Sequence, residues 1–484
     1  MIGKRDRRNR RLFITGDIEQ FIPEDHILKR VDRFLDLSWL SEEVKECYCV
    51  DNGRPSIAPE AAVRLMIAGF FQGIVHDRKL MREAQVNIAI RWFAGHELDE
   101  ELPDHSSLSR IRERWGAEKF KALFTRTVKL CIDAGLVSGE TVHVDSTLIR
   151  ADVSWESIVT KHANEVISEN REEKGDDRIP DDPAKKSGRP RTRDKVKKVS
   201  LTDPEATMAT SSSNYYMEPT YKQHTAVDDQ TGILVDVDLT TGEINEGTKL
   251  IETIDRIEEL TQKPIKCVTA DKGYSHSINY HELDQRNIDA VIPPQRDSKY
   301  GKGNLSIRRF KYDGLHQRVV CPGGKILTRA GRVKKGWLYK SKRIDCRCCN
   351  LCQHCLPPTA RTRSILIVDG YEALLRARRR KLRGWDDHTR RLYNRHRYLV
   401  EGIHGEAKTQ HGLRRAVRRG LENVAIQVYL TAVVINLKRL AIASVGPIYR
   451  CFYIMNGVVK NIFKALTSLG EQYPFSLRSL YITA

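Results

Sequence analysis

The chain changes character at residues 141–149, TVHVDSTLI, where the pattern becomes that of a β-strand. Val142 and Val144 alternate with polar residues, as they do in a strand that buries one face. The carboxylate of Asp145 belongs to the polar set in the middle of this stretch. Since a strand with one buried face needs neighbouring strands, residues 141–149 predict the first strand of a sheet that carries an acid.

The residues that follow supply the other elements of such a sheet. We predict a hairpin at 221–240, a helix at 247–260, strands at 265–270 and 289–292, and helices over 371–441. Residues 296–370 are irregular, strand-like and rich in cysteine. Strands, a helix, more strands and late helices indicate a mixed α/β (α+β) core with an insertion.

The residues before this core are predicted to be helical. Apolar positions recur at helical spacing over 27–35 and 59–70, with Pro59 suited to a first helical turn. Another helix is expected over 79–94, and a further one opens after Asp104 as N-cap. Short helices with basic faces suit a DNA-binding module, and the alternative is an ordinary all-helical domain.

Composition favours a polyanionic partner. The 484 residues carry a net charge of +19, and cations that neutralise phosphates release condensed counterions. The excursion 160–215 contains the basic run 185–198 and is expected to be flexible; it contacts nucleic acid or is a solvated linker. We find neither an apolar segment long enough to cross a bilayer nor a signal peptide, so we expect a cytoplasmic protein without a membrane partner.

A second acid follows the predicted strand 265–270. Asp271 stands in TADKGY, just past an apolar strand, where an open sheet exposes a site to ligands. Gly273 lets the chain turn sharply behind it. On its own, an aspartate at such a place is more often a turn residue or a cap than a ligand.

A third acid belongs to a predicted helix. Arg397, Glu401, His404 and Lys408 are spaced by four, three and four residues, which places them on one helical face. That face offers one metal ligand flanked by cations, or simply a surface stripe of ion pairs. Glu406 is a rival ligand on a different side of the helix, so the two glutamates cannot serve one site.

The cysteines of residues 296–370 have the spacing of zinc ligands. Cys321 precedes a group formed by Cys346, Cys348, Cys349, Cys352 and Cys355, and a CxxC spacing is typical of zinc knuckles. We choose Cys321, Cys346, Cys349 and Cys355 as ligands of a structural Zn²⁺, with His354 as a possible substitute. Reduced cysteines in a loop are the alternative, since disulfides are rare in the cytoplasm.

Together the three acidic blocks resemble the DDE transposases of bacterial insertion sequences, which share an RNase H-like catalytic core. In the branch with an insertion between the second Asp and the Glu, the glutamate helix carries the signature Tyr-x-x-Arg-x-x-x-Glu-x-x-x-x-x-x-Lys. Arg397, Glu401 and Lys408 match its last three positions. The tyrosine position is Asn394, with Tyr393 beside it. The resemblance extends from about residue 15 to about residue 441.

The resemblance implies that Asp145, Asp271 and Glu401 bind two divalent cations, Mg²⁺ or Mn²⁺. Oxygen ligands suit such hard cations, and a two-metal site supports in-line displacement at a phosphodiester. Arg397 and Lys408 would hold the DNA backbone. We add Lys272, Arg414 and Arg415 as DNA contacts because they flank the acids in sequence.

We therefore predict a DNA transposase that cleaves insertion-sequence ends and transfers the strands to target DNA. Its partners would be double-stranded DNA, as inverted repeats and as target, and a second copy in a homodimer; in a bacterium it would work at the nucleoid. The alternatives are a domesticated, catalytically silent DNA-binding protein and an RNase H-like nuclease. The expected segments are a helical DNA-binding domain 1–135, a first core part 136–295, a Cys-rich insertion 296–370, core helices 371–441 and a tail 442–484.

Overall fold

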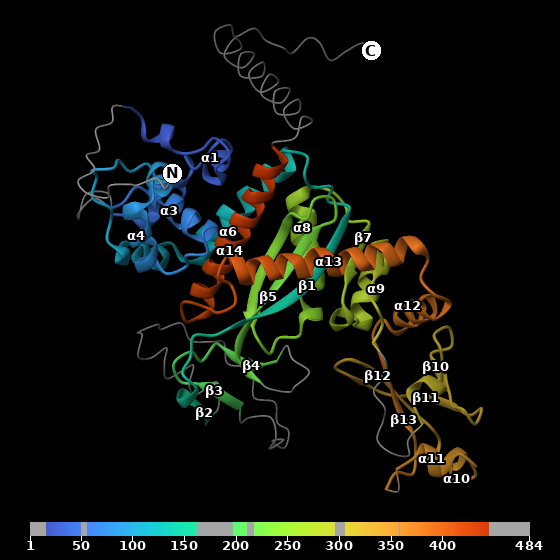
Figure 1. Cartoon of the computed structure of the whole chain (residues 1–484). Coiled ribbons are helices and arrows are strands. Elements are labelled where there is room, and N and C mark those ends of the chain that lie inside the picture. Colours follow the sequence, from blue (N-terminus) through green and yellow to red (C-terminus); the bar gives the residue numbers. More distant parts are fainter. Residues whose placement is uncertain are drawn as a thin grey trace, which may run out of the picture. The chain divides into compact units, whose positions relative to one another are not determined.

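The chain forms two compact units in the computed structural model, which describes residues 16–49, 56–161, 197–210, 217–295, 305–357 and 359–444. Unit 1 comprises Met1–Leu136 and Ala407–Ala484, and unit 2 comprises Val137–Glu406 (Figure 1). This division differs from the expected segments, because the residues after Glu406 cluster with the N-terminal helices rather than with the core.

Unit 1 is helical in the part that the structure describes. Its elements are η1 (Ile18–Phe21), α1 (Ile27–Asp32), α2 (Leu40–Glu43), η2 (Lys45–Cys47), α3 (Pro59–Phe71), α4 (Asp77–Val86), α5 (Ile88–Ala94), α6 (His105–Asp133) and α14 (Leu421–Ala443). Pro59 begins α3 as predicted. Asp104 caps α6, since its side chain accepts a hydrogen bond from the Ser106 amide at 2.9 Å.

The single helix expected over 79–94 is wrong. Two helices, α4 and α5, meet at Asn87, whose backbone is extended rather than helical. The Asn87 side chain accepts a hydrogen bond from the Ile90 amide at 3.2 Å and so caps α5. An asparagine that competes for a backbone amide in this way favours a helix start over a helix interior.

Helix α14 forms the centre of unit 1. It packs against α6, α3 and α1, and its Tyr429 ring stacks on Phe124 of α6 with centroids 6.4 Å apart. Its length and mean hydropathy of 1.4 would allow it to span a membrane, which corrects our expectation that no segment could. However, 83% of the apolar window is buried inside the unit, as in a core helix.

Unit 2 contains the predicted core and its insertion. The core elements are β1 (Thr141–Arg150), η3 (Trp155–Ser157), β2 (Ile158–Lys161), β3 (Lys197–Ser200), β4 (Thr207–Ala209), β5 (Glu218–Asp228), β6 (Leu234–Thr241), η4 (Glu246–Thr248), α8 (Leu250–Thr261), β7 (Cys267–Ala270), η5 (Lys272–Tyr274), α9 (Ser277–Gln285), β8 (Asp289–Val291), α12 (Tyr371–Arg383) and α13 (Asp387–Gln410). These elements confirm the predicted hairpin, helix and strands. Residue 407 is the point at which α13 passes into unit 1.

The central sheet has the strand order that an RNase H-like core requires. β1 lies in the middle, antiparallel to β5, which is in turn antiparallel to β6. On its other side β1 pairs in parallel with β7, and β7 pairs in parallel with β8. The short β4 also pairs with β5, at the end of that strand. The predicted mixed α/β fold with an RNase H-like sheet is therefore present.

Helix α13 crosses this sheet. Its His404 contacts β5 at Thr225, and its His396 ring lies 5.8 Å from that of His143 on β1. Trp385, just before the helix, packs with residues of β7 and β8. Apolar and histidine side chains recur on the buried side of α13, so this side faces the sheet.

The insertion is a separate small sheet of strands in the order β13–β12–β11–β10–β9. Its elements are η6 (Ile307–Arg309), β9 (Lys311–Asp313), β10 (Arg318–Val320), β11 (Ile326–Val333), β12 (Gly336–Lys340), α10 (Arg343–Arg347), α11 (Cys352–Cys355) and β13 (Ser364–Val368). The strand-containing, Cys-rich insertion is thus confirmed. Most of the excursion 160–215, including nearly all of its basic run, and most of the tail 442–484 lie outside the described residues.

Candidate active site

Two of the predicted acids meet through the register of β1 and β7. Val144 pairs with Ala270 in this parallel pair, so the next residues of the two strands, Asp145 and Asp271, stand side by side. Residues opposite each other in adjacent strands point to the same face of a sheet. Asp271 also caps η5, because its side chain accepts a hydrogen bond from the Gly273 amide at 2.7 Å.

Both aspartates lie in surroundings that disfavour their charge. Burial raises the pKa of Asp145 to about 7, and the nearby carboxylates of Asp271, Glu246 and Glu401 add to this rise. Burial also raises the pKa of Asp271, and the charge of Glu246 is the second cause of this rise. A carboxylate held beside like charges in a partly buried place gains from a bound cation.

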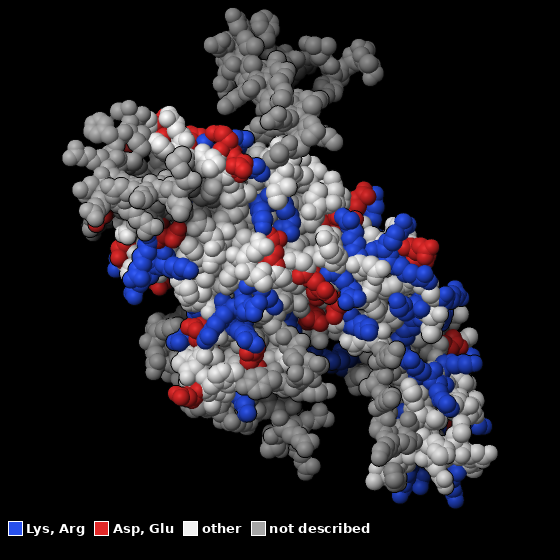
Figure 2. All heavy atoms as spheres, viewed as in Figure 1, with Lys and Arg blue, Asp and Glu red and all other residues white. Residues whose placement is uncertain are grey.

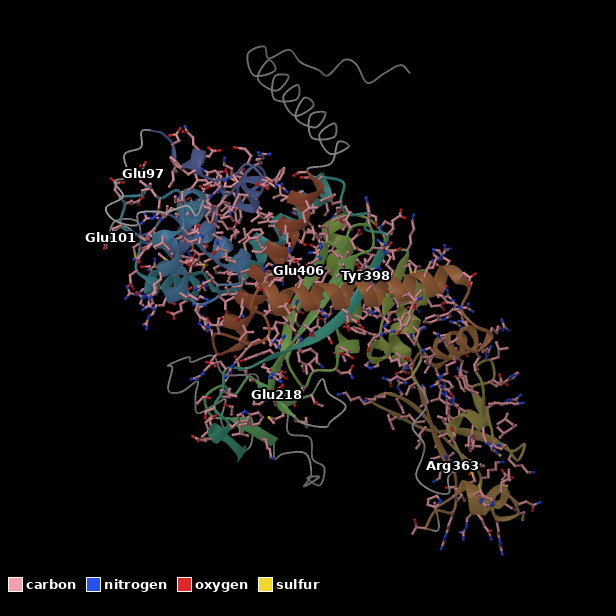
Figure 3. All side chains as sticks on the ribbon, viewed as in Figure 1. Glu97, Glu101, Glu218, Arg363, Tyr398 and Glu406 are labelled. Atoms are coloured by element: carbon pink, nitrogen blue, oxygen red, sulfur yellow. The ribbon has the colours of Figure 1, made fainter. Side chains whose placement is uncertain are left out.

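Helix α13 brings the third predicted acid to the same place. His404 Nδ1 lies 3.8 Å from Asp145 Oδ2, and its Nε2 lies 3.2 Å from the Thr225 hydroxyl. Glu401 stands one turn before His404 and acts electrostatically on Asp145. Glu406, the rival, also lies on α13 (Figure 3) but is not among the main charges acting on Asp145. The charge of Glu401 therefore acts on Asp145 together with that of Asp271.

A fourth carboxylate, Glu246, was not predicted from the sequence. It lies in η4, the 3-10 turn between β6 and α8, and accepts a hydrogen bond from the Ser146 hydroxyl, next to Asp145. Turn residues lack the periodicity that marks strands and helices. The one sequence feature that could have drawn attention to Glu246 is the glycine that follows it, Gly247. Asp271 likewise has a glycine close behind it, Gly273.

Oxygen donors of this kind fit a divalent cation. Carboxylates that repel one another are a suitable ligand set for Mg²⁺ or Mn²⁺. Among described residues, the basic group beside Asp145 is His404, which is a cation only when its ring is protonated, and Asp271 forms no ion pair. In the described part of the chain no three His, Cys, Asp or Glu side chains stand close enough to hold a metal ion as they are. Small side-chain movements would therefore accompany binding.

The predicted DNA contacts fall into two groups. In unit 2, Arg397 forms an exposed ion pair with Glu401 at 3.6 Å, and Lys272 is exposed next to Asp271. In unit 1, Lys408 lies in the last turn of α13, and Arg414 and Arg415 are exposed in the connection to α14. Within unit 2, Arg397 and Lys272 therefore lie beside the predicted acids.

The aromatic residues of α13 clarify the displaced tyrosine of the signature. Asn394 is exposed, whereas Tyr393 is half-buried and stacks on His396 with ring centroids 6.0 Å apart. Burial raises the pKa of Tyr393, and the charges of Asp271, Asp145 and Glu401 act on it as well. Tyr398, which sequence reasoning missed, projects from α13 (Figure 3) with 81% of its side chain exposed.

The four chosen cysteines lie near one another in the insertion. A Cβ on Gly323 would lie 3.4 Å from Cys349 Sγ and 3.7 Å from Cys321 Sγ. Burial raises the pKa of Cys355, Arg363 opposes that rise, and Cys346, Cys321 and Cys349 add to it. Cys348 and His354 are exposed. The structure thus gathers Cys321, Cys346, Cys349 and Cys355, although not within bonding distance of one ion.

Two family models match the chain. Residues 16–114 match a transposase domain (DUF772), and residues 320–441 match a transposase DDE domain, which includes the cysteine group and Glu401. Asp145 and Asp271 lie between the two matches. No curated protein matches the chain.

Two solved structures are distantly similar. The piggyBac transposase synaptic complex with hairpin DNA is 11% identical, covering 94% of this chain and 82% of that one, with a TM-score of 0.30. The Mos1 transposase paired-end complex with left transposon end is 10% identical, covering 52% and 65%, with a TM-score of 0.16. Scores at this level do not establish a common fold. The evidence for kinship therefore comes from the two family models and from the strand order of the sheet: the chain is similar to transposases over residues 16–114 and to the transposase DDE domain over residues 320–441.

Proposed function

We propose that this transposase cuts the ends of an insertion sequence and joins them to target DNA by metal-dependent phosphoryl transfer. The observation that supports the chemistry is the meeting of Asp145, Asp271 and Glu401, which come from two strands and a helix far apart in sequence. These carboxylates would hold two Mg²⁺ or Mn²⁺ ions. Bound there, the cations supply Lewis-acid activation of the attacking and leaving oxygens.

The chain's own residues position the acids and the DNA. The β1–β7 register fixes Asp145 beside Asp271, and His404 ties the glutamate helix to β1 and β5. Arg397, already 3.6 Å from Glu401, can turn to a DNA phosphate once a cation neutralises that glutamate. The exposed Tyr398 offers a ring on which an unpaired base can stack.

The test of the chemistry uses DNA with the ends that flank the gene. Asp271→Asn should reduce Mg²⁺-dependent nicking and joining by about 10³-fold or more while DNA affinity stays near that of wild type. Asp284→Asn, an exposed aspartate paired with Arg376, is the control and should leave cleavage unchanged. Binding without any cut by wild type would instead indicate the silent DNA-binding alternative. Cleavage of branched DNA without joining would indicate a nuclease.

The choice of glutamate can be tested in the same assay. Glu401→Gln should be inactive because its carboxylate acts on Asp145, whereas Glu406→Gln should keep most of the activity. Denaturing gels of nicked and joined products would provide the measurement. The opposite ranking would move the third ligand to Glu406.

The DNA partner is supported by charge. Residues 305–370 contain fifteen Lys and Arg against three Asp and no Glu, and Figure 2 shows Lys and Arg spread over the insertion. We expect affinity for double-stranded DNA to fall steeply as salt rises, since each phosphate contact releases a counterion. A flat salt response would contradict backbone contact. A homodimer that joins two ends remains part of the proposal.

We also propose that Cys321, Cys346, Cys349 and Cys355 hold a structural Zn²⁺. The Lys325 amide donates a hydrogen bond to Cys321 Sγ at 3.3 Å, which suits a thiolate ligand. Metal analysis of purified protein should find about one zinc per chain. Cys346→Ser should lose it, and Cys348→Ser, which alters an exposed thiol, should keep it. Equal zinc content in both variants would contradict this ligand set.

A further inference from the structure

Two short turns meet beside the acids. Turn η4 carries Glu246, and turn η5 follows Asp271. The buried side chain of Asn279 joins the turns, because its amide donates hydrogen bonds to the Gly247 carbonyl at 2.7 Å and to the Tyr274 carbonyl at 3.0 Å. The position of Glu246 is therefore fixed by packing.

Gly273 makes room for the Glu246 carboxylate. A Cβ on Gly273 would lie 1.6 Å from Glu246 Oε1 and 3.0 Å from Asp271 Oδ1. The backbone of Gly273 is not in the left-handed region, so space rather than φ requires the glycine, which corrects our expectation of a sharp turn that needs glycine's freedom. The carboxylates of Glu246 and Asp271 are neighbours across this glycine.

The other oxygen of Glu246 points to the first strand. The Ser146 hydroxyl donates a hydrogen bond to Glu246 Oε2, and Ser146 directly follows Asp145. Glu246 thus has one oxygen beside Asp271 and the other held next to the residue after Asp145. A carboxylate beside Asp271, and near enough to Asp145 for its charge to act on that residue, costs repulsion unless a cation is shared.

A buried hydroxyl in the same place lacks a well-aligned partner. Tyr274 is fully buried, and among described residues its hydroxyl makes no hydrogen bond of good geometry; the Ser146 hydroxyl, which already donates to Glu246, lies beside it. The charges of Asp145, Glu246 and Asp271 act on it. Buried hydroxyls in native proteins are nearly always satisfied, so one left without a well-aligned partner beside carboxylates points to an absent ligand. A water of a hydrated cation would satisfy it, since Mg²⁺ usually keeps several waters.

We infer that the cation site of this transposase is built from four carboxylates, with Glu246 as a cation ligand beside Asp271 and the Tyr274 hydroxyl facing a cation-bound water. The inference rests on the proposed function, which takes Asp145, Asp271 and Glu401 as the other ligands. A purely structural role for Glu246, as acceptor for Ser146, makes opposite predictions about stability.

Cation binding and thermal stability of the full chain test this inference without cleavage. Mn²⁺ titration calorimetry should show affinity weakened about 10- to 100-fold in Glu246→Gln. In EDTA the same variant should melt higher than wild type because repulsion with Asp271 is relieved, and it should lose most of the Mg²⁺-dependent rise in Tm. Glu252→Gln, which alters an exposed glutamate on α8, is the control and should behave as wild type.

The outcomes separate the two ideas. Wild-type Mn²⁺ affinity in Glu246→Gln together with a lower Tm in EDTA would overturn the fourth ligand and leave the proposed function intact. If wild type itself bound no Mn²⁺, the proposed function would fail first. Gly273→Ala is a second route, because its methyl group must displace the Glu246 carboxylate. It should weaken Mn²⁺ binding in the same range, and unchanged affinity would count against the inference.

Discussion

Two aspartates, one in each unit, sit in clusters of partly or fully buried charge with opposite character. Asp77 in unit 1 is 5% exposed and receives hydrogen bonds from Arg112 at 2.7 and 2.8 Å, and Arg418 also pairs with it. Asp145 in unit 2 is 23% exposed and faces three carboxylates, and the nearby His404 Nδ1, 3.8 Å from Asp145 Oδ2, carries a positive charge only when the ring is protonated. One cluster is neutralised within the chain, and the other is not.

The pKa values follow this difference. Burial alone would raise the pKa of Asp77, but Arg112 and Arg418 outweigh it and hold the pKa below its ordinary value. Burial and neighbouring acids raise the pKa of Asp145 to about 7. A buried carboxylate with its counter-ions in the chain supports the fold, whereas one without them is prepared for a cation from outside.

The largest expected effect is the loss of the neutralised cluster. Asp77→Asn leaves Arg112 and Arg418 without their counter-ion and should reduce the stability of unit 1 by about 3–5 kcal/mol. Urea unfolding would measure the loss, and hydrogen exchange should show lost protection in α4, α6 and the connection around Arg418. A change below about 1 kcal/mol would mean that the cluster contributes little and would break the comparison.

The same cluster shows what sequence could not provide. Asp77 and Arg418 are 341 residues apart, and nothing in either stretch indicates the other. α14 is apolar on every side, so its pattern gave no face by which to assign it to the N-terminal helices. By contrast, period-two alternation marked β1, and the acids at 145, 271 and 401 stood at recognisable places on a strand, after a strand and on a helix.

Register and turns account for the rest. The pairing of Val144 with Ala270, which sets Asp145 beside Asp271, depends on how strands assemble. Glu246 belongs to a 3-10 turn whose position is fixed by Asn279 and by two glycines. Contacts between backbone segments that are distant in the chain cannot be predicted from the sequence, in which the glycines are the only visible sign of them.

The second prediction reverses the sign of the first. In EDTA at pH 8, Asp145→Asn should stabilise unit 2 by about 1–3 kcal/mol, because it removes a charge that the folded state disfavours. Thermal or urea unfolding measures this change. Mg²⁺ should stabilise wild type and leave the variant nearly unaffected. Destabilisation of the cation-free protein by Asp145→Asn would show that the cluster is neutralised by groups of the chain.

The pH dependence follows from the same shift. With a folded pKa of about 7, against about 4 when unfolded, the folded state keeps a proton that the unfolded chain releases between these values. The Asp145 contribution to cation-free stability should therefore fall as pH rises from about 4 to 7, by up to about 1.4 kcal/mol per pH unit. The difference between wild type and Asp145→Asn, measured at each pH, isolates this slope. A difference that is constant over the window would contradict the raised pKa.

The smallest effect is expected where charges are paired but exposed. Arg286 and Asp255 form an ion pair in unit 2 with side chains 32% and 55% exposed. Water already solvates both groups, so a double-mutant cycle with Arg286→Gln and Asp255→Asn should give a coupling of about 0.2–1 kcal/mol that falls with salt. A coupling free energy as large as the stability loss expected for Asp77→Asn would mean that the distance between two charges alone sets the strength of their interaction. A small one would show that burial decides which charges of this protein support the fold and which await a ligand.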